Sequence, residues 1–127
     1  MIFDILDPQG TADLRLGMPK SDVRALLGEW REFHRTTESP ASDQFVAAGV
    51  LVTYDECGRV SVIEFADPAS PRLSGALMLG LTVSQLRESL TRLGLHVDLD
   101  VDVILVPSWR MSFYAPDEKV AGLLLGE

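Results

Sequence analysis

Two stretches of the chain carry apolar residues at helical spacing, and a glycine follows each of them. In the first stretch, Val23, Leu26 and Leu27 form one apolar stripe between Pro19 and Gly28. Proline fixes φ favourably in the first turn of a helix, and glycine readily adopts the backbone conformation that ends one. The pattern therefore predicts a short amphipathic helix.

The second helical stretch lies in the other half of the chain. Its apolar positions on one face are Val83, Leu86, Leu90 and Leu93. Thr82 stands where an N-cap is needed, and Gly94 follows the last apolar position. A second short helix with the same kind of ending is predicted.

Six further stretches are rich in β-branched and aromatic residues and are separated by turn residues. They cover residues 30–36, 45–54, 60–66, 95–106, 110–114 and 120–125. This composition predicts strands with mostly antiparallel neighbours, and residues 37–43 read as a polar loop between two of them.

Short segments of the two halves resemble each other in the same order. Residues 16–27 (LGMPKSDVRALL) match residues 79–90 (LGLTVSQLRESL), and residues 53–63 match residues 113–123. Chance matching of short apolar segments is the alternative to a duplication. The matches predict a single domain over residues 1–127, with similar halves at about 12–66 and 75–127 and a Pro/Ser-rich connector at 67–74.

These patterns together predict an α+β fold. Two similar helix-plus-antiparallel-strand units would form one sheet, with the helices packed on one face. Each half has only about 60 residues and would bury a thin core alone, so we expect the two halves to share one core.

The composition is that of a soluble globular protein, with 46% hydrophobic and 24% charged residues. Nineteen acidic and eleven basic residues give a formal net charge of −8. Because phosphate backbones and anionic membranes repel such a protein, neither nucleic acid nor a membrane is an expected partner. The charge suits a basic protein partner, although it would serve solubility equally well.

A single cysteine allows no intramolecular disulfide and no cysteine-rich metal site. The N-terminal residues lack the pattern of a secretory signal, and no apolar run reaches transmembrane length. The expected location is therefore the cytoplasm.

The segment Asp55-Glu56-Cys57-Gly58 joins two predicted strands. An aspartate that starts a turn can accept hydrogen bonds from backbone amides, and the glycine can adopt a positive φ. A reactive thiolate needs a cationic setting, whereas Cys57 follows two acidic residues. We therefore interpret the segment as a hairpin turn rather than a reactive site.

Catalytic and cofactor motifs are absent from the sequence. His34 and His96 fall in no zinc or catalytic spacing, and there is no nucleophile elbow, phosphate-binding loop or dinucleotide fingerprint. The expectation is a protein that is not an enzyme and that uses no cofactor or metal.

An acidic stretch places Asp98, Asp100 and Asp102 at the first, third and fifth positions of a would-be calcium loop. Val103 replaces the glycine needed at the sixth position, and Trp109 replaces the glutamate needed at the twelfth. The alternating apolar positions are instead Leu95, Val97, Leu99, Val101 and Val103. A strand with one acidic face is therefore predicted.

This acidic face has two interpretations. It is either a solvated surface that discourages sheet-edge association, or a docking surface for basic side chains of another protein. In the second interpretation Asp98, Asp100, Asp102 and Trp109 form the partner-binding site, with the indole as an aromatic anchor. Trp109 as an ordinary core residue is the alternative.

Two segments carry a resemblance to a known group of proteins. Residues 14–28 (LRLGMPKSDVRALLG) and 49–65 (GVLVTYDECGRVSVIEF) resemble the repeat unit of the group that includes the β-lactamase inhibitor protein and the SmpA/OmlA lipoproteins. The resemblance implies short helices on one face of an antiparallel sheet and a role in binding other proteins. The lipid-attachment and disulfide cysteines of that group are missing, so membrane anchoring and β-lactamase inhibition are not implied.

The leading functional hypothesis is a non-enzymatic protein-interaction module, inhibitor-like or immunity-like, that binds a basic protein. The alternative is a small-molecule-binding protein or enzyme with a site between sheet and helices. A homodimer with a self-complementary sheet face is a third interpretation.

Overall fold

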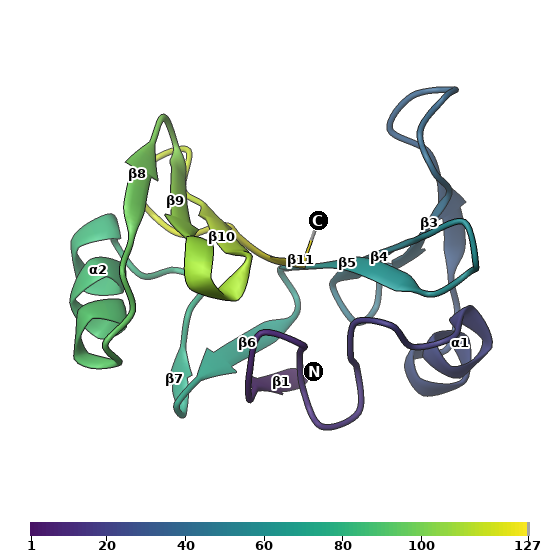
Figure 1. The fold of residues 1–127 in the computed structure, drawn as a ribbon, viewed down its shortest axis with the longest axis horizontal. Coiled ribbons are helices and arrows are strands. Elements are labelled where there is room, and N and C mark those ends of the chain that lie inside the picture. The colour runs from purple at the N-terminus through teal and green to yellow at the C-terminus, as the bar shows by residue number, and fades with distance from the viewer. Residues whose placement is uncertain (127) are drawn as a thin grey trace.

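The computed structural model describes residues 1–126, which form eleven strands in two sheets and two short α-helices (Figure 1). The larger sheet is antiparallel throughout, in the order β2-β3-β4-β5-β11-β10-β9-β8. Its strands are β2 (Arg31–Phe33), β3 (Ser42–Phe45), β4 (Val50–Tyr54), β5 (Val60–Ala66), β8 (Asp98–Asp100), β9 (Val103–Val106), β10 (Met111–Tyr114) and β11 (Gly122–Gly126).

A second, three-stranded sheet has the order β1-β6-β7. Its strands are β1 (Ile2–Ile5), β6 (Ser70–Leu73) and β7 (Ala76–Leu77), and β1 runs parallel to β6. The helices are α1 (Lys20–Leu27) and α2 (Val83–Arg92), and a 3₁₀ turn, η1 (Pro107–Trp109), separates β9 from β10.

The predicted α+β fold class is wrong, because the described chain is mostly β. It has two sheets rather than one, and its α-helices have only 8 and 10 residues. Helices therefore do not form the layer that was expected on the sheet. The N-terminal strand β1 pairs with β6, which lies in the predicted connector, and pairing between such distant segments leaves no local sequence pattern.

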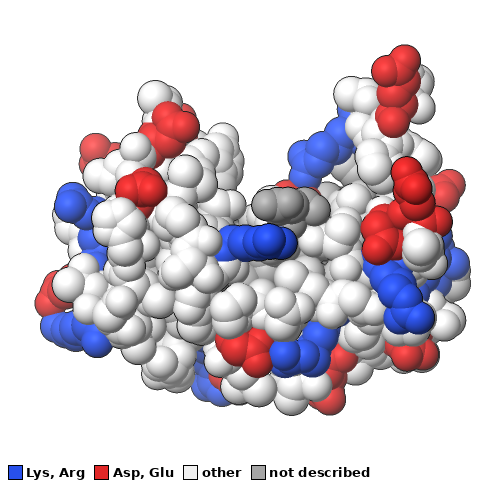
Figure 2. Space-filling view, viewed as in Figure 1, with Lys and Arg blue, Asp and Glu red and all other residues white. Residues whose placement is uncertain are grey.

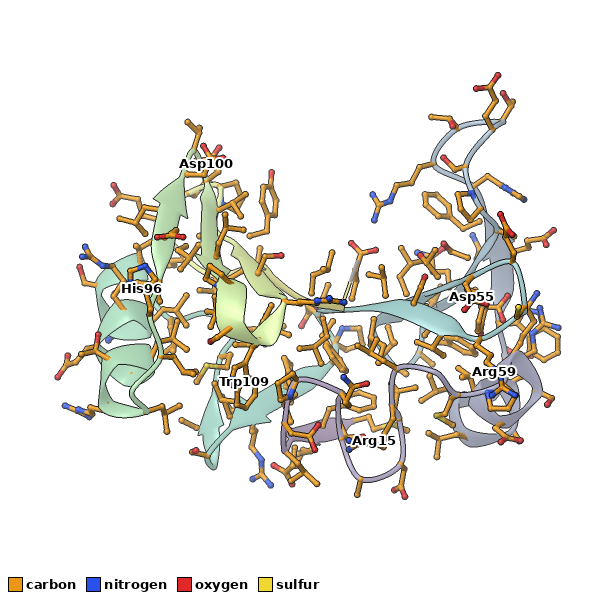
Figure 3. The ribbon with its side chains drawn as sticks, in the orientation of Figure 1. Arg15, Asp55, Arg59, His96, Asp100 and Trp109 are labelled. Atoms are coloured by element: carbon orange, nitrogen blue, oxygen red, sulfur yellow. The ribbon has the colours of Figure 1, made fainter. Side chains whose placement is uncertain are left out.

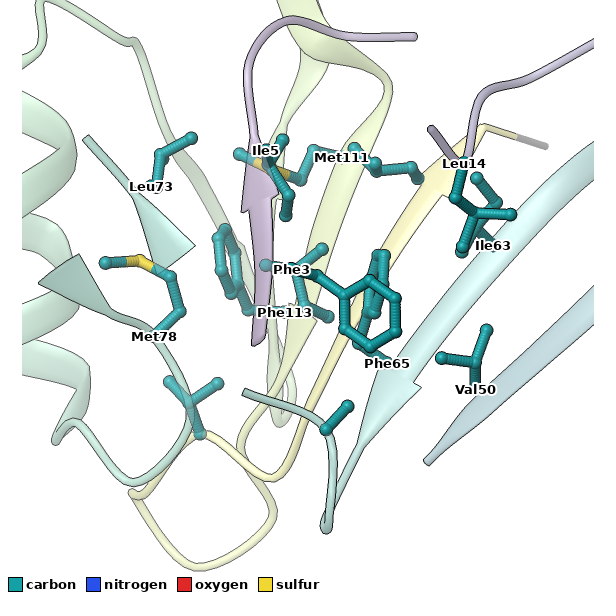
Figure 4. Packing of buried hydrophobic residues seen from close by; sticks show 14 of the residues in the cluster. Phe3, Ile5, Leu14, Val50, Ile63, Phe65, Leu73, Met78, Met111 and Phe113 are labelled. Atoms are coloured by element: carbon teal, nitrogen blue, oxygen red, sulfur yellow. The ribbon is translucent and has the colours of Figure 1, made fainter. Parts of the chain in front are cut away.

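The core lies on one face of the large sheet, where the second sheet packs (Figure 4). Phe65, Leu123 and Phe113 are cross-strand partners in β5, β11 and β10, and all three are buried. The ring of Phe3 in β1 lies 5.1 Å from the ring of Phe65. The two sheets therefore share one apolar cluster.

Both helices lie where the sequence predicts them. Helix α1 begins after Pro19 and ends at Gly28, whose φ is 84°. Helix α2 begins with a capping box in which Thr82 accepts a hydrogen bond from the Gln85 amide and the Gln85 side chain accepts one from Thr82. These reciprocal bonds satisfy donors that a helix N-terminus otherwise leaves free.

The two halves of the large sheet meet where β5 pairs with β11. In the first half, the Gly17 amide donates to the carbonyl of Val60 at 2.8 Å. In the second half, the Gly80 amide donates to the carbonyl of Val120, also at 2.8 Å. Gly17 and Gly80 occupy the same position in the first pair of matching segments, and Val60 and Val120 do so in the second pair. The duplication and the two-half division nevertheless stay predictions.

Two predicted strands are in fact hairpins. Residues 95–106 form β8 and β9 around a turn at Val101 and Asp102, and the φ of Asp102 is +58°. Residues 45–54 span the end of β3, a turn, and β4. Alternating apolar residues continue across such a short turn, so the pattern by itself does not reveal the reversal of direction.

Candidate functional site

The face of the large sheet opposite the core is concave and open. Figure 1 shows the β8–β9 hairpin rising on one side of this face and the segment between β2 and β3 rising on the other. Figure 2 shows the surface hollowed between these two arms, with acidic side chains on both. We call this surface the open face.

A row of cross-strand partners forms the floor of the open face. From β3 to β8 its members are Gln44, Leu51, Glu64, Leu124, Ser112, Leu105 and Asp98. Side chains alternate between the two faces of a strand, so this row points away from the buried residues. Leucines alternate with polar residues along this row.

A hollow of about 430 Å³ lies in this floor. Its lining includes Arg35, Glu64, Val103, Tyr114 and Leu124. Tyr114 is 52% exposed, which is high for an aromatic side chain in the middle strands of a sheet. The hollow thus combines apolar walls, a phenol and one pair of opposite charges.

The charge pair joins Arg35 to Glu64. The Arg35 Nη2 atom donates to both carboxylate oxygens of Glu64, at 2.7 and 2.6 Å. The side chain of Arg35 is 60% exposed and that of Glu64 is 26% exposed. Because solvent reaches the pair, its contribution to folding stability is small.

Two of the predicted site residues lie on the open face. Asp98 and Asp100 of β8 are the cross-strand partners of Leu105 and Val103, and both aspartates are exposed. Asp98 Oδ1 lies 2.9 Å from Nε2 of His96. The raised hairpin therefore presents carboxylates toward the concave surface.

The other two predicted residues lie elsewhere. Asp102 is exposed but occupies the left-handed position of the β8–β9 turn rather than a third step on the same strand. Trp109 packs against the core from the 3₁₀ turn η1. Figure 3 shows Asp100 at the tip of the hairpin and Trp109 on the other side of the sheet, so the structure does not bring them together.

The predicted turn between β4 and β5 is confirmed. Asp55 Oδ1 accepts hydrogen bonds from the amides of Cys57 and Arg59, at 2.8 and 3.0 Å. The φ of Gly58 is 75°, and Cys57 is exposed. Asp55 therefore has a structural role in the turn.

A buried polar cluster was missed by sequence reasoning, which placed Asp43 in a loop. Asp43 lies in β3, is 2% exposed, and accepts two hydrogen bonds from Arg24 of α1, at 2.7 and 3.0 Å. The hydroxyl of Tyr54 donates to the same carboxylate at 2.8 Å. Arg24 also lies over the ring of Trp30, 4.1 Å from its centroid. This cluster fastens α1 to the sheet.

The cluster shifts the acidity of its members. Burial opposes ionisation of Asp43, but the hydrogen bonds from Arg24 and Tyr54 outweigh it and lower the pKa of the carboxyl. Burial, together with the bond to the Asp43 carboxylate, raises the pKa of Tyr54 well above its usual value. No local motif signals this cluster, since its members come from three separate elements.

Comparison with protein families, with curated proteins and with solved structures found no match for this chain. Neither of the two described α-helices has the length and apolar character needed to cross a membrane. Within residues 1–126, His, Cys, Asp and Glu side chains nowhere gather in threes as a metal site would need.

Proposed function

We propose that this chain is a non-enzymatic protein-interaction module, inhibitor-like or immunity-like, that binds a basic protein on its open face. The observation that carries the proposal is the shape of the large sheet: one face holds the core, while the other is concave and uncovered by the described elements. A surface of this kind accommodates a protruding loop or edge of another protein.

The composition of the open face supports a protein partner. Its floor carries Leu51, Leu124 and Leu105, and exposed Tyr114 stands beside the hollow. Interfaces between proteins have apolar centres, are enriched in tyrosine, and are ringed by polar side chains. The Arg35–Glu64 pair adds a polar group that can define orientation.

The charge distribution supports a basic partner. The chain has a formal charge of −8, and Asp98, Asp100 and Asp102 project from one arm of the open face. Within the described chain, neither Asp100 nor Asp102 forms an ion pair with a basic side chain. Exposed carboxylates of this kind accelerate encounter with a positively charged protein.

A charge-reversal variant tests the proposal. The variant carries Asp98→Lys, Asp100→Lys and Asp102→Asn, because asparagine tolerates the left-handed backbone of the turn. Wild-type chain captures its partner from the native cell, and the purified pair is then studied by biolayer interferometry at several salt concentrations. We expect association to slow by about tenfold at low salt and the difference to vanish at high salt.

A matched control keeps the net charge of this variant but places the changes elsewhere. It carries Asp22→Lys, Glu88→Lys and Glu56→Gln, three exposed positions on the two helices and the β4–β5 turn. The control should associate nearly as fast as wild type. Equal slowing in both variants would show that only net charge matters and would remove the aspartates from the interface.

The other two interpretations have their own tests. Apolar side chains pack the region between sheet and helices, where the alternative small-molecule or enzyme site was expected. A crystal structure with a metabolite bound there would replace our proposal. Sedimentation at several concentrations separates a homodimer, whose mass rises with concentration, from a monomer that awaits a different protein.

A further inference from the structure

The hollow of the open face already contains a guanidinium group, supplied by the chain itself. Arg35 follows β2 and reaches Glu64 in β5, 29 positions away in the sequence. Glu64 is the only carboxylate, and Arg35 the only cation, among the described residues that line this hollow. The hollow thus has one anionic group, the Glu64 carboxylate.

The surroundings of Glu64 are those of a binding site for a long cationic side chain. Its cross-strand neighbours are Leu51 and Leu124, which offer apolar contact to a methylene stem. Tyr114 lines the same hollow and presents an exposed ring, which attracts cations. About 430 Å³ stays open with Arg35 in place, so the hollow has room for a second side chain.

The backbone that carries Arg35 is held independently of the ion pair. The Thr36 amide donates to the Ser39 hydroxyl at 3.0 Å, and the Ser39 amide donates to the Thr36 hydroxyl at 3.1 Å. These bonds close the segment between β2 and β3 on itself. The Arg35 side chain, which is 60% exposed, can therefore leave Glu64 without unfolding the segment.

Docking of a partner would change how strongly the Glu64 carboxylate interacts with a cation. In solvent the Arg35–Glu64 pair is weak, but a protein that covers the hollow removes water from the carboxylate. A carboxylate without water needs close and well-aligned cationic donors, and Arg35 donates to Glu64 from Nη2 alone. An acidic surface draws a basic protein, so the partner itself brings the side chain that meets this need.

We propose that the hollow receives an arginine or lysine side chain from a loop of the basic partner, and that this side chain replaces Arg35 on Glu64. The inference rests on the proposed function and adds the contact at its centre. Arg35 acts as an internal competitor, which occupies the carboxylate until the partner displaces it. Its release to solvent accompanies binding.

A minimal probe tests this contact without the native partner. N-acetyl-L-arginine methylamide is titrated into ¹⁵N-labelled protein, and N-acetyl-L-citrulline methylamide, a neutral isostere, is the control ligand. We expect saturable shifts of the amides of Ala66, Gly122 and Leu124 with the arginine compound, about tenfold tighter than with the citrulline compound.

Two variants separate the roles of the pair. Arg35→Gln removes the competitor and should tighten arginine binding by about threefold. Glu64→Gln removes the carboxylate that binds the guanidinium and should abolish the preference for arginine over citrulline. Dispersed spectra and unchanged thermal midpoints verify that both variants fold.

Equal affinity for the two compounds, absence of binding, or shifts confined to the β8–β9 hairpin would each overturn the inference. So would weaker arginine binding by Arg35→Gln. None of these results touches the interaction function itself, which depends on capture of a protein partner and on the charge-reversal variant.

Discussion

Asp43 is a charged side chain that is almost fully buried, so its ionised form needs hydrogen-bond donors inside the protein. An ionised carboxylate away from water is costly unless charged and polar donors surround it. Here Arg24 and Tyr54 supply three hydrogen bonds. At the surface, Arg35 contacts the Glu64 carboxylate through Nη2 alone, and solvent weakens this pair. Burial therefore decides which pair stabilises the fold and which is free to rearrange.

Replacement of Arg24 with glutamine should destabilise the protein by about 3 kcal/mol at pH 7, because it leaves the buried carboxylate without its cation. The pKa of Asp43 is lowered in the folded state, so its contribution is complete above the unfolded pKa of about 3.9 and is lost as the pH falls through the folded pKa. The loss of unfolding free energy caused by Arg24→Gln should therefore be smaller at acidic pH. Urea unfolding between pH 7 and pH 2.5 measures both effects.

Arg92→Gln is the matched control for this prediction. Arg92 pairs with Glu88 on the surface of α2, and both side chains are well exposed. Its loss should change stability by less than about 0.5 kcal/mol. Similar losses from the two substitutions would mean that burial gives the Arg24–Asp43 pair no special weight.

Tight turns decide the arrangement of the strands. The β8–β9 turn places Asp100 opposite Val103 and turns a predicted single strand into an arm of the open face. The turns that contain Gly49 and Gly58 also need positive φ, at 73° and 75°. They differ in their surroundings, since Gly49 is crowded by neighbouring backbone and Gly58 is open to solvent.

Alanine at the two glycines should therefore have unequal effects. Gly58→Ala adds a Cβ that meets no atom within 4 Å, so only the left-handed backbone is penalised, by about 1 kcal/mol. A Cβ at Gly49 would lie 2.3 Å from the carbonyl oxygen of Ala66, which raises the expected loss to about 3 kcal/mol or more. Thermal and urea unfolding of both variants compare them; equal losses would contradict the crowding argument.

At the scale of the whole molecule, one core holds together both sheets and both halves of the large sheet. β5 pairs with β11 across the middle of the large sheet, and β1 pairs with β6 after a separation of more than 60 residues. Phe3 meets Phe65 at the contact between the two sheets. The open face is consequently a property of the complete chain, since each half supplies one arm and half of the floor.

A chain that stops at residue 66 should not fold. It lacks β11 and β6, so β5 loses one partner, β1 loses its only partner, and the apolar residues that they cover are exposed. Circular dichroism and a ¹H–¹⁵N spectrum should show an unfolded chain, whereas the full chain should unfold in one cooperative transition. Cooperative unfolding of the shorter chain would show that the first half is an independent unit.

Several local features were decided by the sequence alone. The two helices, the bounds of β5, the Asp55–Gly58 turn and the glycine after each helix follow from spacing, capping and backbone preference within a few residues. These interactions depend on neighbours along the chain, and so a local pattern is sufficient to predict them.

The alternation placed Asp98 and Asp100 on one face, but tertiary structure decided the rest of the site. The sequence alternation did not reveal that residues 95–106 reverse direction or that a second sheet covers one face, and it left open whether Trp109 packs against the core. The pairs Arg24–Asp43 and Arg35–Glu64 join residues 19 and 29 positions apart. Such contacts depend on strand register and sheet order, which are set by burial over the whole chain and not by any short segment of it.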